Sequence, residues 1–360
     1  MQNETGVSFL EATFRSIYPQ DQEWRERAEA RIKELTMPYW ALGDLLDLAV
    51  DLAGMTRSLR PPVARKKVVI MVGDHDVVEE GVSLYPAEVT TRMVYNFIRG
   101  GAGINALARQ AGAEMCVVDV GGRDDFVDLV SSGRVLAKKI GRGAANIARG
   151  PAMSRTHAVL AVEAGVEVAG QLAETVDVFA TGEMGVGNTT PGAAIAAVLT
   201  GKSVASLTGR GTGIDDQQLQ HKITVIKQAL ERNQPDPADA FDVLAKVGGF
   251  EIGAIAGLVL GAAAHRKPVV VDGLIATAGA ALACRLEPFV RDFIICGHQS
   301  VEPGQKALID MLRLRQPLLN LNMRLGEGTG AVLALNIVEA AAMVLGDMAT
   351  FAEAGFSGKT

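Results

Sequence analysis

The sequence predicts an α/β protein built on a parallel sheet, and three observations carry this prediction. Of the 360 residues, 48% are apolar but only 5% are aromatic. The chain contains 40 glycines, which suit tight strand-to-helix turns and close packing of helices on a sheet. Short apolar runs rich in β-branched residues also alternate with amphipathic or alanine-rich helical segments, which is the pattern of repeated βα units.

Five apolar runs that change to glycine or a polar residue at their carboxyl ends are the expected strands. In an open parallel sheet the ligand crevice lies outside the carboxyl ends of the strands, so we expect the five ends to converge on one site. The runs are VVIMVGDHD at 68–76, CVVDVGG at 116–122, VFATGEMGVGN at 178–188, VVVDG at 269–273 and FIICGHQS at 293–300.

The chain divides into three predicted parts. Residues 1–60 are expected to form a helical subdomain, because most of this segment has helical spacing and heavy charge. A proline pair directly after Arg60 breaks the pattern, and the α/β domain is expected over 61–346. Residues 347–360 are expected to form a C-terminal tail.

Composition excludes several classes of protein. The net charge is −6 and no basic block is interleaved with aromatic residues, which argues against a nucleic-acid groove. The apolar stretch 253–264 is too short to span a bilayer and predicts a buried helix. The first thirty residues are charged and lack the apolar run of a secretory signal, so we expect a cytoplasmic protein. Cys116, Cys284 and Cys296 are widely separated and are interpreted as structural thiols.

The run GEMGVGNTTPG at 182–192 predicts a strand, a glycine loop and an N-capped helix. Gly185 and Gly187 let backbone amides approach an anion, and a helix N-terminus adds partial positive charge, so a phosphate or a sugar hydroxyl suits this loop. Tight-turn packing alone would also explain the glycines. Glu183 favours a ligand, since its carboxylate can accept hydrogen bonds from ribose hydroxyls.

A second glycine run, TGRGTGIDD at 208–216, offers further amides around Gly211, and Lys222 follows it on a predicted helix. Lys222 is a candidate phosphate partner, although a solvated lysine is the commoner finding. The segment TGKS at 200–203 lacks the first glycine of a phosphate-binding loop, because Ala196 stands there.

The segment GDHD at 73–76 could ligate a metal through Asp74, His75 and Asp76, but no other histidine is spaced to complete the site. Hydrogen-bonded turn chemistry is the favoured interpretation, so no metal and no cofactor are expected.

Near the C-terminus, MRLGEGTGA at 323–331 places Glu327 between glycines. Such a carboxylate can meet a substrate directly, and in an apolar site it would be a stronger base than a solvated one. The alternative is a glutamate that caps the helix that follows.

Together these segments resemble the nicotinate-nucleotide:dimethylbenzimidazole phosphoribosyltransferase family. The resemblance runs from about residue 41 to 346, with the motifs in the family's order. They are GDHDVVEEGVSLYPAEVT, GGAGINALAR, GEMGVGNTTPGAA, TGRGTGIDD, GGFEIGAIAGL, VVVDGLIATAGA, GHQSVEPG and MRLGEGTGA.

The resemblance implies a Rossmann-like parallel sheet flanked by helices, a small helical domain from the N-terminal and C-terminal segments, and a homodimer with sites near the subunit contact. It implies transfer of 5-phosphoribosyl from nicotinate mononucleotide to a benzimidazole in cobalamin biosynthesis. Glu327 is then similar to the family's general base and Glu183 to its ribose-side carboxylate. The implied nucleotide and phosphate contacts are Gly185, Gly187, Gly211, Lys222, Asp272 and Ser300.

The expected base-binding wall around Tyr85, Met93, Met184 and Leu325 is apolar and sulfur-rich, without the amide side chain that some family members offer. This leaves dimethylbenzimidazole, another benzimidazole, a purine or a phenolic compound open as acceptor. Two further positions depart from the family pattern: Asp76 stands where glycine is usual, and Gln305 where histidine is common.

Two other functions compete with the transferase. A nucleotide-binding partner subunit without catalysis is disfavoured by the presence of Glu183 and Glu327. A nicotinamide-dependent oxidoreductase is disfavoured because no G-x-G-x-x-G turn follows the first expected strand.

Overall fold

The computed structural model describes residues 8–355, so both extreme ends of the chain, within the predicted subdomain 1–60 and tail 347–360, lie outside the described residues. A six-stranded parallel sheet forms the centre, in the order β3-β2-β1-β4-β5-β6. The α/β prediction with a Rossmann-like parallel sheet is confirmed. The strands are β1 (Lys66–Gly73), β2 (Ala113–Gly121), β3 (Leu136–Ala137), β4 (Val178–Met184), β5 (Val269–Val271) and β6 (Ile294–Cys296).

All five predicted strands are present, and the sixth, β3, was not predicted. Its two residues pair at the sheet edge with Val118 and Asp119 of β2, too short a segment to produce a periodic signal. Neighbouring β1 and β4 are the pair at which the strand order reverses, because the chain builds outward from β1 in one direction and from β4 in the other. Ligands bind at such a switch point in open α/β sheets.

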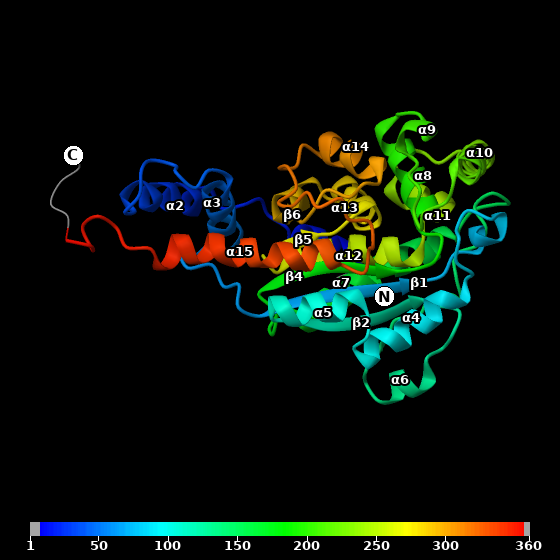
Figure 1. Ribbon diagram of the computed structural model, residues 1–360, viewed down its shortest axis with the longest axis horizontal. Coiled ribbons are helices and arrows are strands. Elements are labelled where there is room, and N and C mark those ends of the chain that lie inside the picture. Colours follow the sequence, from blue (N-terminus) through cyan, green and yellow to red (C-terminus); the bar gives the residue numbers. More distant parts are fainter. Residues whose placement is uncertain (1–7, 356–360) are drawn as a thin grey trace.

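Helices surround the sheet and pack closely on each other (Figure 1). Helix α12 is buried from its first residue to Ala263 and contacts β1, β2, β4 and β5, while α7 and α13 pack beside it. Helices α4, α5 and α15 also contact strands of the sheet: α4 contacts β1 and β4, α5 contacts β2, and α15 contacts β4 and β5. The helices between β1 and α15 are α4 (Glu88–Arg99), α5 (Gly103–Ala111), α6 (Val127–Ser131), α7 (Arg155–Leu172), α8 (Thr189–Thr200), α9 (Val204–Leu207), α10 (Asp216–Asn233), α11 (Ala240–Val247), α12 (Phe250–Ala264), α13 (Leu274–Leu286) and α14 (Pro303–Leu312), with short 3-10 helices η1 (Asp76–Glu80) and η2 (Pro288–Phe293).

The N-terminal helices lie beside the end of the chain. Helices α2 (Gln22–Glu34) and α3 (Asp44–Thr56) contact the C-terminal helix α15 (Thr329–Asp347). Figure 1 shows α2 and α3 at one end of the molecule, from which α15 runs toward the middle. Helix α1 (Phe9–Arg15) instead contacts α7 and α12. After α15 the backbone of Thr350 bridges to Leu35, so the segment that follows the last helix is tied to the end of α2.

Helix α15 is, within residues 8–355, the one helix long and apolar enough to cross a membrane by length and composition. Most of it is buried, against α3, α5, β4 and β5. Core helices of globular proteins pass the same test, so this is weak evidence for a membrane span. The stretch 253–264, which the sequence predicts as a buried helix, is the body of α12 and is buried as far as Ala263.

Candidate active site

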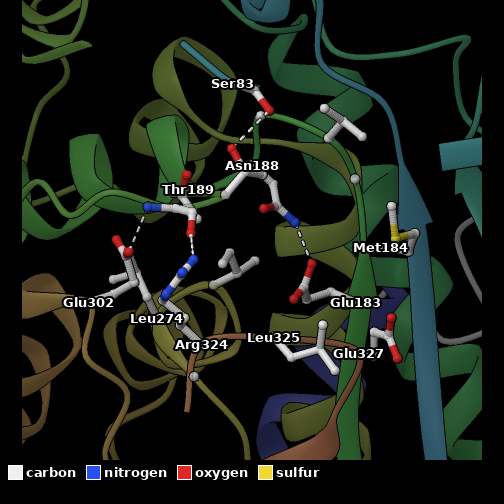
Figure 2. Close-up of a pocket in the computed structure, with 18 of the residues that line it drawn as sticks. Ser83, Glu183, Met184, Asn188, Thr189, Leu274, Glu302, Arg324, Leu325 and Glu327 are labelled. Carbon is white, nitrogen blue, oxygen red and sulfur yellow. Dashed lines mark hydrogen bonds between the residues drawn. The ribbon is translucent and has the colours of Figure 1, made fainter. Parts of the chain in front are cut away.

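A cavity of about 930 Å³ opens at the carboxyl ends of β4, β5 and β6 (Figure 2). This volume lies within the usual range for a site that holds small molecules. Segments that are distant in sequence meet around it. The lining residues come from 82–93, 183–189, 211–212, 273–276, 298–302 and 323–327.

The expectation that all five strand ends converge is correct only in part. The residues after β4, β5 and β6 line the cavity, and the segment after η1 brings the β1 side to it. The end of β2 does not reach the lining. Directly after β1, His75 turns away and its Nε2 lies 2.7 Å from Oε1 of Glu251, with both side chains fully buried.

The loop between β4 and α8 is shaped by contacts that only glycine permits. A Cβ on Gly185 would lie 2.1 Å from the carbonyl oxygen of Gly73, and Gly187 has a left-handed φ of 88°. Asn188 occupies the N-cap position of α8 but makes no side-chain cap, which corrects the predicted N-cap. Its side-chain amide donates a hydrogen bond to Glu183 instead. No side chain at the N-cap position accepts a hydrogen bond from the first N–H groups of α8.

Glu183 lines the cavity while only 7% exposed. Burial raises its pKa to about 8, and although the hydrogen bond from Asn188 works in the opposite direction, the nearby carboxylates of Asp272, Glu251 and Glu327 add to the rise. A neutral carboxyl group is therefore the main form at pH 7, able to donate as well as accept a hydrogen bond.

Glu327 lies within a run of three left-handed residues, with φ of 80° at Gly326, 61° at Glu327 and 88° at Gly328. Its Oε2 accepts a hydrogen bond of 3.2 Å from the backbone N–H of Ile104, in the first turn of α5. The carboxylate thus meets the N-terminus of a helix, but of α5 and not of the helix that follows it. Burial raises the pKa of Glu327 despite that hydrogen bond, and Asp272 contributes to the rise.

The two glutamates can face the same space because Gly326, which passes beside Glu183, has no side chain. A Cβ on Gly326 would lie 2.3 Å from Oε1 of Glu183, so the loop before α15 passes directly over the end of β4. Figure 2 shows both carboxylates at the cavity wall with Leu325 beside them. All four predicted base-binding residues, Tyr85, Met93, Met184 and Leu325, line the cavity as well.

At the other end of the cavity, positive and polar groups surround Gly211. Lys222 is 1% exposed, so it is not a solvated lysine, the alternative that the sequence left open. Its Nζ donates a hydrogen bond to Oγ1 of Thr189 at 2.7 Å. Burial lowers the pKa of Lys222 to about 8, against the opposing charge of Glu302. The backbone N–H of Gly211 donates to Oε1 of Glu302 at 2.8 Å, and the Arg324 guanidinium donates to the carbonyl oxygen of Gly211 at 2.6 Å.

Not every predicted nucleotide contact lines the cavity. Gly185, Gly187, Gly211 and Ser300 do, whereas Lys222 lies behind Thr189. Asp272 is also behind the wall, where its Oδ1 accepts from the backbone N–H of Ala331 at 2.9 Å and lies 3.3 Å from Nε2 of His298.

Gln305 fixes the ends of two strands from behind the cavity. Its Nε2 donates to the carbonyl oxygens of Asp272 and His298, at 2.8 and 2.9 Å, and its Oε1 accepts from the backbone N–H of Ser300 at 2.6 Å. The residue is 1% exposed. Each hydrogen-bonding group of this amide is therefore used, and none of them titrates near neutral pH.

The remaining candidate groups are engaged within the protein. Asp74 accepts from the backbone N–H of Arg123 at 2.8 Å, and Asp76 pairs with the Arg123 guanidinium at 2.5 Å. The cysteines are not reactive thiols, because burial raises the pKa of Cys116 to about 11 and those of Cys284 and Cys296 to about 12.

Glu302, Arg324, Asn188 and Thr189 were not predicted as site residues. Asn188 and Thr189 lie in the glycine loop that the sequence singled out, so that motif carried a usable signal for them. Glu302 and Arg324 contact Gly211 across 91 and 113 residues, and no local pattern indicates such contacts.

Known proteins are similar to this chain over almost its whole length. A family model described as phosphoribosyltransferase matches residues 17–356. The nicotinate-nucleotide–dimethylbenzimidazole phosphoribosyltransferase of Desulfotalea psychrophila is 56% identical, over 96% of this chain and 98% of its own. That of Syntrophotalea carbinolica is 54% identical, over 98% and 99%. The chain belongs to the nicotinate-nucleotide–dimethylbenzimidazole phosphoribosyltransferase family.

A crystal structure of a family member agrees with the fold. The enzyme of the same name from Thermus thermophilus superposes with a TM-score of 0.88 at 42% identity, covering 94% of this chain and all of that one. The resemblance read from the motifs is confirmed, and with it the assignment of the chain to the phosphoribosyltransferases.

Proposed function

We propose that the chain transfers the 5-phosphoribosyl group of nicotinate mononucleotide to 5,6-dimethylbenzimidazole or a related base, as its relatives' names state for them, in activation of the lower ligand of cobalamin. The observation that carries the proposal is one cavity with two ends. Amides and Arg324 line one end, with Lys222 behind Thr189, and an apolar wall with two methionines forms the other. Glu183 and Glu327 line the same cavity.

The nucleotide end suits an anion. The N-terminus of α8 has no side-chain cap, and the glycines of the β4–α8 loop let backbone N–H groups approach a phosphate. Lys222 and Arg324 supply positive charge close to Gly211. A largely neutral Glu183 can hydrogen-bond ribose hydroxyls without adding a second negative charge beside the phosphate.

The transfer requires little more than alignment and the removal of one proton. A ring nitrogen of the acceptor bonds to C1′ of the ribose while the bond from C1′ to the pyridinium nitrogen breaks, and that electron pair leaves the departing nicotinate ring neutral. The acceptor gains positive charge, which it loses when its second ring nitrogen gives its proton to Glu327. Burial makes Glu327 a stronger base than a solvated glutamate, and holding both rings about C1′ removes most of the entropic cost.

Nicotinate release tests the function. The purified protein is mixed with nicotinate mononucleotide and, separately, 5,6-dimethylbenzimidazole, benzimidazole, adenine and phenol, and free nicotinate is followed by chromatography. We expect base-dependent release, fastest with a benzimidazole because the apolar wall offers no amide partner to a purine. An absence of release with every base would exclude the transferase.

We also propose that the enzyme acts in the cytoplasm and that it is a homodimer. The family resemblance supports the homodimer.

A further inference from the structure

The side chain of Thr212 joins the nucleotide end of the cavity to the segment that carries part of its apolar wall. Thr212 follows Gly211 at the nucleotide end, and its Oγ1 accepts a hydrogen bond of 3.0 Å from the backbone N–H of Leu84. The hydroxyl of Ser83 lies 3.5 Å from the same oxygen. Leu84 is followed by Tyr85, one of the residues of the apolar wall.

The loop that carries Thr212 is fixed on its nucleotide side. The peptide groups of Gly211 are bonded on both sides, by Glu302 at the N–H and by Arg324 at the carbonyl oxygen. The residue has a left-handed φ of 50°, and a Cβ there would lie 2.8 Å from Oγ1 of Thr189 and 3.3 Å from Nζ of Lys222. The loop therefore rests on the groups that would meet a phosphate.

The same loop contacts the apolar wall from a second direction. Arg324 directly precedes Leu325, which lines the cavity beside Glu327. The wall segments 83–85 and 323–325 are distant in sequence, and residues 211–212 hydrogen-bond to both. A small shift of this loop would move both walls of the base-binding end together.

We propose that Thr212 is a positioning residue that couples the two substrates, so that filling the nucleotide end orders segment 83–85 and strengthens binding of the acceptor base. This deepens the proposed function and rests on it. A phosphate beside Gly211 would add contacts to the loop that Glu302 and Arg324 already hold. The Thr212 hydroxyl joins the backbone of Leu84 to that loop, and Tyr85 is placed against the acceptor ring. Because coupling between two binding sites is reciprocal, the base must strengthen nucleotide binding by the same factor.

The experiment measures binding without turnover. Ribose 5-phosphate carries the sugar and phosphate but no leaving base, so it fills the nucleotide end and cannot react. Calorimetry measures the Kd of 5,6-dimethylbenzimidazole for the whole protein, with and without saturating ribose 5-phosphate. In the wild type we expect about three- to tenfold tighter binding of the base when ribose 5-phosphate is present, which is what one net hydrogen bond supplies.

Two substitutions isolate the hydroxyl. Thr212→Val keeps the shape of the side chain and loses its acceptor, so the Kd of the base should no longer depend on ribose 5-phosphate. Thr212→Ser keeps the oxygen and should restore the wild-type difference. A residue that merely supports the fold would change both Kd values in both variants.

The proposal is overturned if ribose 5-phosphate leaves the base affinity of the wild type unaltered, or if Thr212→Val keeps the coupling. It is also overturned if Thr212→Ser loses coupling as fully as Thr212→Val. These results are separate from the proposed function, whose own failure would be an absence of nicotinate release by the wild-type protein.

Discussion

At the scale of the residue, Glu327 holds a backbone conformation that few side chains adopt. A non-glycine residue with φ near 60° is held at a cost of roughly 1–3 kcal/mol, and such residues cluster at functional sites. Here the conformation turns the carboxylate onto the N-terminus of α5 and into the cavity. A helix N-terminus favours the ionised form, whereas burial favours the neutral form, and the pKa of Glu327 is raised because burial has the larger effect.

Replacement of this carboxylate tests its role as base. Glu327→Gln keeps the size of the side chain and an oxygen that can accept from Ile104, but it cannot take up the acceptor's proton at neutral pH. We expect kcat to fall by at least about 100-fold, the lower end for loss of a general base, with an unchanged KM for nicotinate mononucleotide. Initial rates of nicotinate release measure both constants.

The matched control is Gln305→Glu. This substitution also alters a buried polar side chain near the cavity, but Gln305 does not line the cavity. Its carboxylate would oppose the carbonyl oxygens of Asp272 and His298, so loss of stability should accompany any loss of rate. Glu327→Gln should melt within a few degrees of the wild type. Near-normal kcat in Glu327→Gln would remove the residue from its role.

Sequence predicted the two central carboxylates because each follows or interrupts a glycine-rich run, a local signal. Glu302 gave no such signal. It is the N-cap residue of α14, directly before a proline, where an acidic residue is ordinary, and its importance arises only from the approach of Gly211. Gln305 similarly looks like a surface residue of a helix until the strand ends that it joins are placed together.

At the scale of the element, helices α7 and α12 approach so closely that their backbones touch. A Cβ on Gly165 would lie 1.9 Å from the carbonyl oxygen of Ala254, and one on Gly257 would lie 1.9 Å from that of Val162. The many glycines predicted close packing of helices on the sheet. They did not indicate this contact between helices, because neither helix identifies its partner in its own sequence.

This contact predicts that a substitution normally favourable in a helix will be harmful here. Gly165→Ala gains about 1 kcal/mol of helix propensity, but the methyl group must push two backbones apart, at a typical cost of roughly 1–3 kcal/mol or more. We expect net destabilisation by at least about 1 kcal/mol. The midpoint of urea unfolding measures it.

Gly170 lies in the same helix and supplies the control. The nearest atom to a Cβ there is Nε2 of His265, at 3.8 Å, which is ordinary van der Waals contact. Gly170→Ala should therefore raise the unfolding midpoint, by an amount equivalent to about 0.5–1 kcal/mol. If both variants shifted the unfolding midpoint in the same direction, the close approach of α7 and α12 would not be the reason that position 165 requires glycine.

At the scale of the whole molecule, the sequence predicted the sheet and its ligand-binding edge because strand ends are marked by an abrupt change from apolar to polar residues. It did not predict which ends contribute. The order of strands decides that, and it places β2 and β3 on the far side of β1 from the cavity. The rim of the cavity is likewise a product of folding, since Tyr85 and Leu325 are far apart in the sequence.

The exposure of that rim bears on assembly. Tyr85 and Leu325 are 53% and 60% exposed in the single chain although both line the cavity, and Leu84 beside them is 50% exposed. Exposed apolar groups around a site are typical of a surface that a partner covers, and a two-fold homodimer is the commonest such assembly.

We therefore expect analytical ultracentrifugation of the wild-type protein to give the mass of two chains. The Leu325→Asp variant should dissociate on dilution, because a buried, unpaired carboxylate is costly at an interface. Val127 on α6 is 72% exposed and away from the cavity, so Val127→Asp should remain a dimer. A wild-type protein that sediments as one chain at every concentration would contradict the homodimer. If Val127→Asp dissociated the dimer and Leu325→Asp did not, the interface would lie away from the cavity mouth. Contact between subunits would then not explain the apolar rim.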